Sequence, residues 1–139
     1  MALFLMGADV CIARERAGHD RDSAIPQMRA AMDDLFQADC HFYGILTTSF
    51  LVETLMERGL DGDVAEAEVA IERLAAVRAD EGLVIRDIWL LRLRALLARA
   101  HGDDARYRDF RDRYRETART LAFEGHIAWA QAMPGRRQA

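Results

Sequence analysis

The sequence predicts an all-α fold of three stacked antiparallel helical hairpins, closed by a short C-terminal capping helix. Alanine, leucine, arginine and glutamate dominate its 139 residues, and all four are strong helix formers. Apolar residues recur at helical spacing almost throughout, without sustained strand alternation. A joint between helices also recurs: a glycine, then an acidic residue, then an amphipathic helix. The glycines of successive copies stand 44 and 40 positions apart, a period typical of helical-hairpin repeats. We expect one domain over 1–133 and a disordered tail at 134–139.

The N-terminal half is expected to form three helices. The first covers 3–17 and ends at Gly18. The second covers 25–37, with Pro26 in its first turn, where a missing N–H costs nothing. The third covers 38–58 and ends at Gly59, whose lack of a side chain suits a helix C-terminus.

The C-terminal half is expected to form four more helices, over 64–77, 84–100, 104–121 and 125–132. Gly102 ends the second of these, and Pro134 follows the last. The last helix would close the stack by laying one side over the 104–121 helix; that side holds Ile127, Trp129 or Ala130, and Met133.

The joint between the third and fourth helices also resembles the ends of a calcium loop. Asp61 and Asp63 flank a glycine, and Glu72 stands eleven positions after Asp61. A calcium loop needs a further oxygen ligand where Ala65 stands and a glycine where Glu66 stands. Two requirements fail, so the sequence favours a turn between helices.

The turn interpretation assigns a role to each residue of the joint. Gly62 makes the tight turn, Asp63 caps the next helix, and Glu66 completes a capping-box-like pair. One apolar face then follows, made of Ala67, Ile71, Leu74 and Val77.

The segment "GDVAEAEVAIERL" resembles the second half of a tetratricopeptide repeat, with small and bulky residues at its packing positions: Gly62, Ala67, Ile71 and Leu74. The copy "GDDARYRDF" is degenerate, because Tyr107 stands where a small residue is usual. Over nearly its whole length, and most specifically from Gly62 to Pro134, the chain resembles the C-terminal helical region of large actinobacterial signalling proteins. Those proteins carry an adenylate cyclase or LuxR-type DNA-binding domain and a STAND-type ATPase module. The resemblance implies a tetratricopeptide-like helical module.

The catalytic parts of those relatives have no counterpart here. A GxxxxGK[ST] phosphate loop needs a lysine, and all nineteen basic side chains of the chain are arginine. We take the absence of lysine and asparagine as the imprint of a GC-rich bacterial genome. No cyclase metal motif is present either.

Charge and cysteine usage exclude several function classes. A net charge of −4 argues against a nucleic-acid binder. The longest uncharged run, 40–52, is too short to span a bilayer, and the apolar start lacks the basic region of a signal peptide. Cys11 and Cys40 form no CxxC pair. We therefore expect a cytoplasmic protein that binds neither nucleic acid nor membrane.

The sequence signals no catalytic centre, metal or cofactor. His41 beside Cys40 could be half a metal site, but no second pair accompanies it, so a helix-surface or packing role is favoured. His19 and His101 stand beside turn glycines, where an imidazole favours the helix dipole. Neither serine lies in a nucleophile turn. We expect no enzyme activity.

The 104–121 helix carries six arginines and invites a nucleic-acid or membrane interpretation. Acidic residues are interleaved with them, as in the pairs Asp109–Arg113 and Asp104–Arg108. A salt-bridged, solvated face explains the pattern better. The opposite face is expected to be core, with Tyr107, Phe110, Tyr114, Ala118 and Leu121.

Candidate binding residues share one arc of the 84–100 helix: Trp89, Arg92, Leu96 and Arg99. In a tetratricopeptide hairpin this arc faces the concave groove, and the third helix would add Ser49, Val52 and Met56. An arginine pair beside an aromatic ring suits a carboxylate, such as an acidic peptide end. The simpler alternative is a partly buried Trp89 with arginines paired to local acids.

These observations predict a non-catalytic protein-interaction or regulatory scaffold module. The alternative is a small-molecule sensor that binds its ligand between the third and fifth helices; a small all-α enzyme using His41 is a weaker third. An enclosed pocket would favour the sensor and an open groove the scaffold.

The first helix predicts self-association. Leu3, Phe4, Met6 and Val10 belong to two apolar faces, more than a terminal helix usually exposes. A two-fold homodimer would cover this strip; alternatively, the second helix wraps round it.

Overall fold

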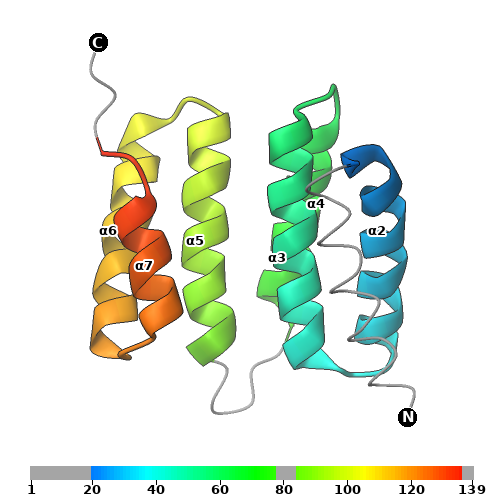
Figure 1. Ribbon diagram of the computed structural model, residues 1–139, viewed down its shortest axis with the longest axis horizontal. Helices are drawn as coiled ribbons and strands as arrows, with labels where there is room; N and C mark the ends of the chain where they lie inside the picture. The colour runs from blue at the N-terminus through cyan, green and yellow to red at the C-terminus, as the bar shows by residue number, and fades with distance from the viewer. Residues whose placement is uncertain (1–19, 78–83, 136–139) are drawn as a thin grey trace. The chain divides into compact units, whose positions relative to one another are not determined.

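The computed structural model describes residues 20–77 and 84–135, which form six α-helices and no strand. The chain divides into two compact units, Met1–Val77 (unit 1) and Arg78–Ala139 (unit 2). Three of the described helices belong to each unit, and Figure 1 shows their course. The expected first helix and most of the expected tail lie outside the described residues.

Unit 1 contains α2 (Arg21–Gln37), α3 (His41–Arg58) and α4 (Asp63–Ala76). Helices α2 and α4 both pack against α3, each as its antiparallel sequence neighbour (Figure 1). Most of α3 is therefore buried, including the unbroken run 47–52. The large, fully enclosed aliphatic side chains come from all three helices: Ile25, Met28, Leu35, Ile45, Leu51, Val52, Leu55, Ile71 and Leu74.

Unit 2 contains α5 (Val84–Ala100), α6 (Asp104–Thr120) and α7 (Glu124–Ala132). Helix α6 packs against α5 along its length and against the shorter α7. The buried side chains include Ile88, Leu93, Tyr107, Tyr114, Ala118, Ala130 and Met133. The prediction of an all-α fold, with antiparallel sequence neighbours and a short C-terminal helix, is confirmed.

Helix α2 begins four residues earlier than the sequence predicted. Asp20 is its N-cap, because its carboxylate accepts hydrogen bonds from the backbone N–H and the hydroxyl of Ser23. Pro26 consequently lies inside the helix, so its predicted place in the first turn is wrong. The cap bonds to Ser23 hold the pKa of Asp20 below its ordinary value.

Positive-φ glycines end α3 and α5 as predicted. Gly59 lies at the C-cap of α3 with φ of 64°, and Gly102 follows α5 with φ of 73°. Asp103 then caps α6 by accepting a 3.0 Å hydrogen bond from the Arg106 N–H. The predicted joint of glycine followed by acidic cap is therefore present before α6.

We expect Gly62→Ala to destabilise the protein by about 1 kcal/mol, because its φ of 88° strains any residue with a Cβ. Open space surrounds this position, so steric clash is not the cause. The matched control is Gly125→Ala in α7, also in open space and without a positive φ, which should be neutral or stabilising. Urea unfolding of the two variants measures the difference; equal effects would contradict the backbone argument.

No helix in the described ranges 20–77 and 84–135 is long and apolar enough to cross a membrane.

Candidate functional site

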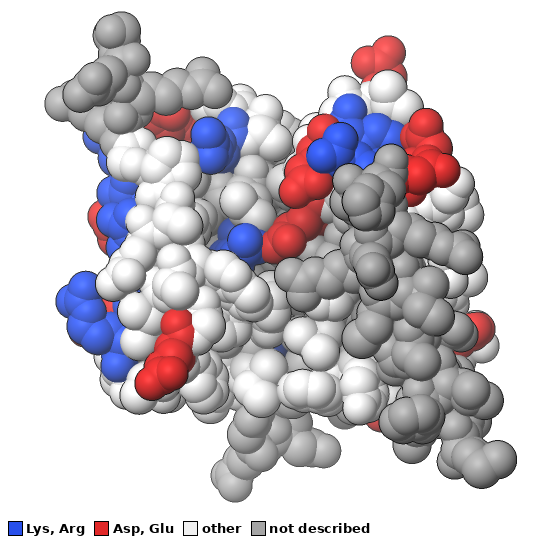
Figure 2. Space-filling model, in the orientation of Figure 1, with Lys and Arg blue, Asp and Glu red and all other residues white. Residues whose placement is uncertain are grey.

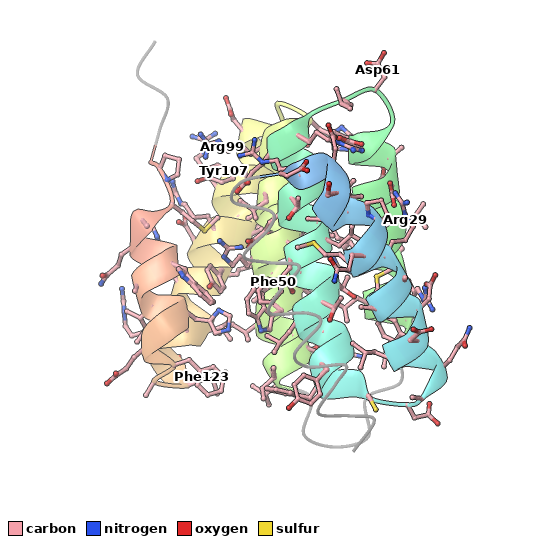
Figure 3. The ribbon with its side chains drawn as sticks, turned by 45° about the vertical axis from the view of Figure 1, so that its right-hand side comes forward. Arg29, Phe50, Asp61, Arg99, Tyr107 and Phe123 are labelled. Atoms are coloured by element: carbon pink, nitrogen blue, oxygen red, sulfur yellow. The ribbon has the colours of Figure 1, made fainter. Side chains whose placement is uncertain are left out.

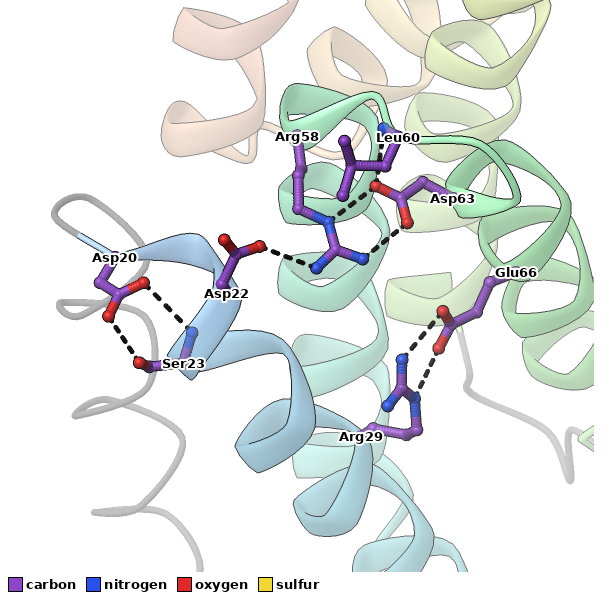
Figure 4. A network of polar contacts seen from close by, with 8 residues as sticks. All are labelled: Asp20, Asp22, Ser23, Arg29, Arg58, Leu60, Asp63 and Glu66. Atoms are coloured by element: carbon purple, nitrogen blue, oxygen red, sulfur yellow. Dashed lines mark hydrogen bonds and ion pairs between the residues drawn. The ribbon is translucent and has the colours of Figure 1, made fainter.

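The turn between α3 and α4 is closed by an ion pair, not by a helix cap. Arg58 donates from Nε and Nη2 to the two carboxylate oxygens of Asp63, at 2.9 and 2.7 Å (Figure 4). The Leu60 N–H donates to the same carboxylate at 3.0 Å. Arg58 also reaches Asp22 on α2, at 3.0 Å.

This geometry corrects the predicted capping box. Gly62 occupies the N-cap position of α4, and Asp63 is the first helical residue. The Asp63 side chain is only 3% exposed and points back to the preceding turn, because the bidentate guanidinium and the Leu60 N–H satisfy its oxygens there. Chiefly because Arg58 donates to it, the pKa of Asp63 lies below its ordinary value.

Glu66 is not the capping-box partner either. It accepts two hydrogen bonds from Arg29 of α2, at 2.6 and 3.0 Å (Figure 4). A second ion pair between the same two helices joins Arg73 to Asp33, and the Arg73 guanidinium lies 4.7 Å from the centre of the Phe36 ring. These pairs tie α2 to α4, so the described joint is structural.

The most distinctive cluster lies in unit 2, around a buried tyrosine and histidine. The Tyr114 hydroxyl on α6 is 2.6 Å from Nδ1 of His126 on α7. Tyr114 is fully buried and His126 is 9% exposed. Besides the Tyr114 ring, three further aromatic rings surround the imidazole, with centroids 4.7 to 6.1 Å away: Trp89, Trp129 and Phe123.

Burial fixes the protonation of this pair. It lowers the pKa of His126 to about 4, and the positive charge of Arg92 acts in the same direction. It raises the pKa of Tyr114, against the opposing influence of Arg92. Both groups are neutral at pH 7, so the contact is a hydrogen bond between uncharged groups whose donor is set by the imidazole tautomer.

Trp129 presents part of this cluster to the outside. The residue is 36% exposed, although its ring contacts those of both Trp89, at 5.3 Å, and His126, at 5.2 Å between centroids. The Arg92 guanidinium lies 5.4 Å from the same ring, within cation–π distance. Helix α7 thus holds an exposed tryptophan in a fixed orientation beside a positive charge.

Helix α6 holds the C-terminal end of α7. Arg115 donates to the carbonyl oxygens of Ala130 and Met133, both at 3.0 Å, and the Tyr107 hydroxyl donates to that of Pro134 at 2.7 Å. These bonds are made to carbonyls at and just beyond the end of α7, where the helix itself supplies few donors. The expected packing of α7 on α6 is present through Ala130 and Met133, whereas Trp129 lies partly outside.

The arginines of α6 partly follow the predicted salt-bridged pattern. Arg113 pairs with Asp109 at 3.5 Å, as expected. Arg108 instead donates to the backbone carbonyl of Asp104. Further local pairs join Arg111 to Asp112 and Arg119 to Glu116.

The predicted groove residues fall in both units. In unit 1, Val52 is buried, Met56 is half-buried, and the buried Ser49 donates its hydroxyl to the Ile45 carbonyl at 2.8 Å. In unit 2, Trp89 is 4% exposed, Arg92 and Leu96 are intermediate, and Arg99 is exposed at the C-terminal end of α5 (Figure 3). A groove shared by α3 and α5 stays a prediction.

The predicted self-association residues Leu3, Phe4, Met6 and Val10 lie outside the described residues, as does the His41 side chain. Among the side chains that the structure does describe, no group of three or more His, Cys, Asp or Glu could hold a metal ion.

His126 is the residue that the sequence analysis missed. A signal was present, because Phe123 and Trp129 stand three positions before and after it, on one side of a helix. A histidine between two aromatic residues at that spacing is typical of a packed position. Its tyrosine partner stands twelve positions away, and no pattern of neighbouring residues indicates that the two side chains meet.

The chain matches no protein-family model, no curated protein and no solved structure.

Proposed function

We propose that this protein is a non-catalytic protein-interaction module that presents unit 2 to a cytoplasmic partner. The observation that carries the proposal is Trp129, exposed yet held by Trp89, His126 and Arg92. Tryptophan and arginine are enriched at the energetic centres of protein interfaces. A fixed ring also loses little side-chain entropy when a partner covers it.

The resemblance to the helical ends of actinobacterial cyclase and LuxR-type ATPase proteins supports a regulatory scaffold role. The expected partner carries an acidic peptide end, because an arginine beside an aromatic ring suits a carboxylate. Arg92, beside Trp129, is the residue that would contribute this charge.

A capture experiment tests the proposal. The wild type and Trp129→Ala are immobilised and exposed to extract of the native cells, and bound proteins are identified by mass spectrometry. Phe42→Ala is the matched control, because Phe42 is 51% exposed and lies in unit 1. We expect a partner retained by wild type and control and reduced at least about tenfold by Trp129→Ala, the loss typical of a central interface tryptophan. Equal capture by all three overturns the proposal.

A further inference from the structure

The two units carry opposite charge, which the whole-chain value of −4 conceals. Residues 20–77 contain four arginines and twelve acidic residues, a formal charge of −8. Residues 84–135 contain ten arginines and seven acidic residues, a formal charge of +3. The negative unit of one copy therefore attracts the positive unit of another copy.

In unit 1 the internal ion pairs already use every arginine that the structure describes there. Arg21 pairs with Glu57, and the other three are Arg29, Arg58 and Arg73, whose partners lie on α2 and α4. Six exposed acids of residues 20–77 form no ion pair within the described part of the chain: Asp20, which caps α2, and Asp34, Asp39, Asp61, Glu68 and Glu72. These carboxylates are exposed to solvent and therefore accessible to the positive charge of a second molecule.

The outward face of α4 concentrates this unused charge around an apolar centre. Glu68 and Glu72 stand one turn apart, and Val69 between them is 69% exposed. Like charges at this spacing destabilise a helix by about 0.2 to 0.5 kcal/mol, which a cationic partner would relieve. Asp61 extends the charge to the tip of the preceding turn (Figure 3). Paired charges of both signs gather near the same end of unit 1 (Figure 2).

The positive counterpart lies on α5, which contains four arginines and only one acidic residue, Asp87. Asp87 pairs with Arg86 at 3.0 Å. Arg94 and Arg99 form no ion pair with any described residue, and Arg99 is exposed. On α6, by contrast, local acids offset most of the arginines.

We propose that the chain self-associates, with the α4 face of one copy (Glu68, Val69 and Glu72) against Arg94 and Arg99 of α5 in a second copy. This inference goes beyond the proposed function and does not depend on it. Exposed ion pairs contribute about 0 to 1 kcal/mol each, so the association is weak and is screened by salt.

Sedimentation velocity between about 5 and 200 μM protein, at about 20 and 500 mM NaCl, tests the proposal, because salt screens exposed charges. We expect concentration-dependent association at low salt and a monomer at high salt. Glu68→Arg/Glu72→Arg and Arg94→Glu/Arg99→Glu should each reduce association at least about fivefold, as loss of two ion pairs implies. An equimolar mixture of these two variants should restore it, because the reversed faces are complementary.

A wild type that stays monomeric at low salt overturns the proposal, and so does association that survives both charge reversals. Association strengthened by salt and abolished by Phe4→Glu also overturns it, since an apolar contact would then be responsible. Circular dichroism checks that each variant keeps its helical content. Trp129→Ala is expected to sediment as the wild type does, so this test and the capture experiment can fail separately.

Discussion

Lowering the pH from 7.5 to 4 is expected to cost the wild type about 2 to 3 kcal/mol of unfolding free energy through His126 alone, given its pKa of about 4 in the folded chain. The unfolded chain binds a proton near pH 6.5, whereas the buried imidazole resists it. The unfolded state therefore holds more protons between these values. His126 therefore does not lower the unfolding free energy above pH 6.5. The loss that it causes grows as the pH falls from 6.5 to 4 and is constant below.

Urea unfolding at several pH values measures this effect, and Tyr114→Phe/His126→Phe is the comparison. The double variant removes the titrating group together with the hydroxyl that bonds to it, so no polar atom of the pair stays buried. Between pH 6.5 and 4, the unfolding free energy of the double variant should fall less than that of the wild type, and the difference should be the same 2 to 3 kcal/mol. Carboxylates such as Asp20 and Asp63 lower the stability of both proteins alike at lower pH. Parallel pH profiles would show that His126 does not titrate as a buried group.

The sequence predicted the helices well because their signals are local. The bounds of α5 agree with the prediction, since apolar residues recur at helical spacing from Val84 onward and the positive-φ Gly102 follows the last helical residues. The start of α2 was missed because Pro26 was taken as a first-turn residue. Asp20 and Ser23 form an equally local cap signal one turn earlier, and its hydrogen bonds determine where the helix begins.

The site was less predictable because its contacts join different helices. The spacing of Asp63 and Glu66 fits a capping box, but arginines outside the joint compete for both carboxylates. Arg58 is five positions away and could have been considered; Arg29 lies thirty-seven positions away on another helix. The Tyr114–His126 pair was unpredictable for the same reason, since only the packing of α7 on α6 brings the hydroxyl to the ring.

The second large effect is expected for Asp63→Ala, which should lower the melting temperature by about 10 °C. The substitution leaves the Leu60 N–H and the partly buried Arg58 guanidinium without their main acceptor. Arg58 keeps only Asp22, whose side chain is 78% exposed and therefore well screened. Thermal unfolding followed by circular dichroism measures the shift.

Two further variants separate the charge from the hydrogen bonds at this turn. Asp63→Asn keeps an acceptor for the Leu60 N–H and should lose less than Asp63→Ala, since an uncharged amide oxygen still satisfies the buried donor. Glu68→Ala changes an exposed acid of the same helix that forms no ion pair in the described part of the chain, and should leave the melting temperature almost unchanged. If Asp63→Ala and Glu68→Ala melt at the same temperature, the ion pair does not hold the turn. Helix α4 is then positioned by the packing of Ala67, Ile71 and Leu74 against α3 and by its two ion pairs to α2.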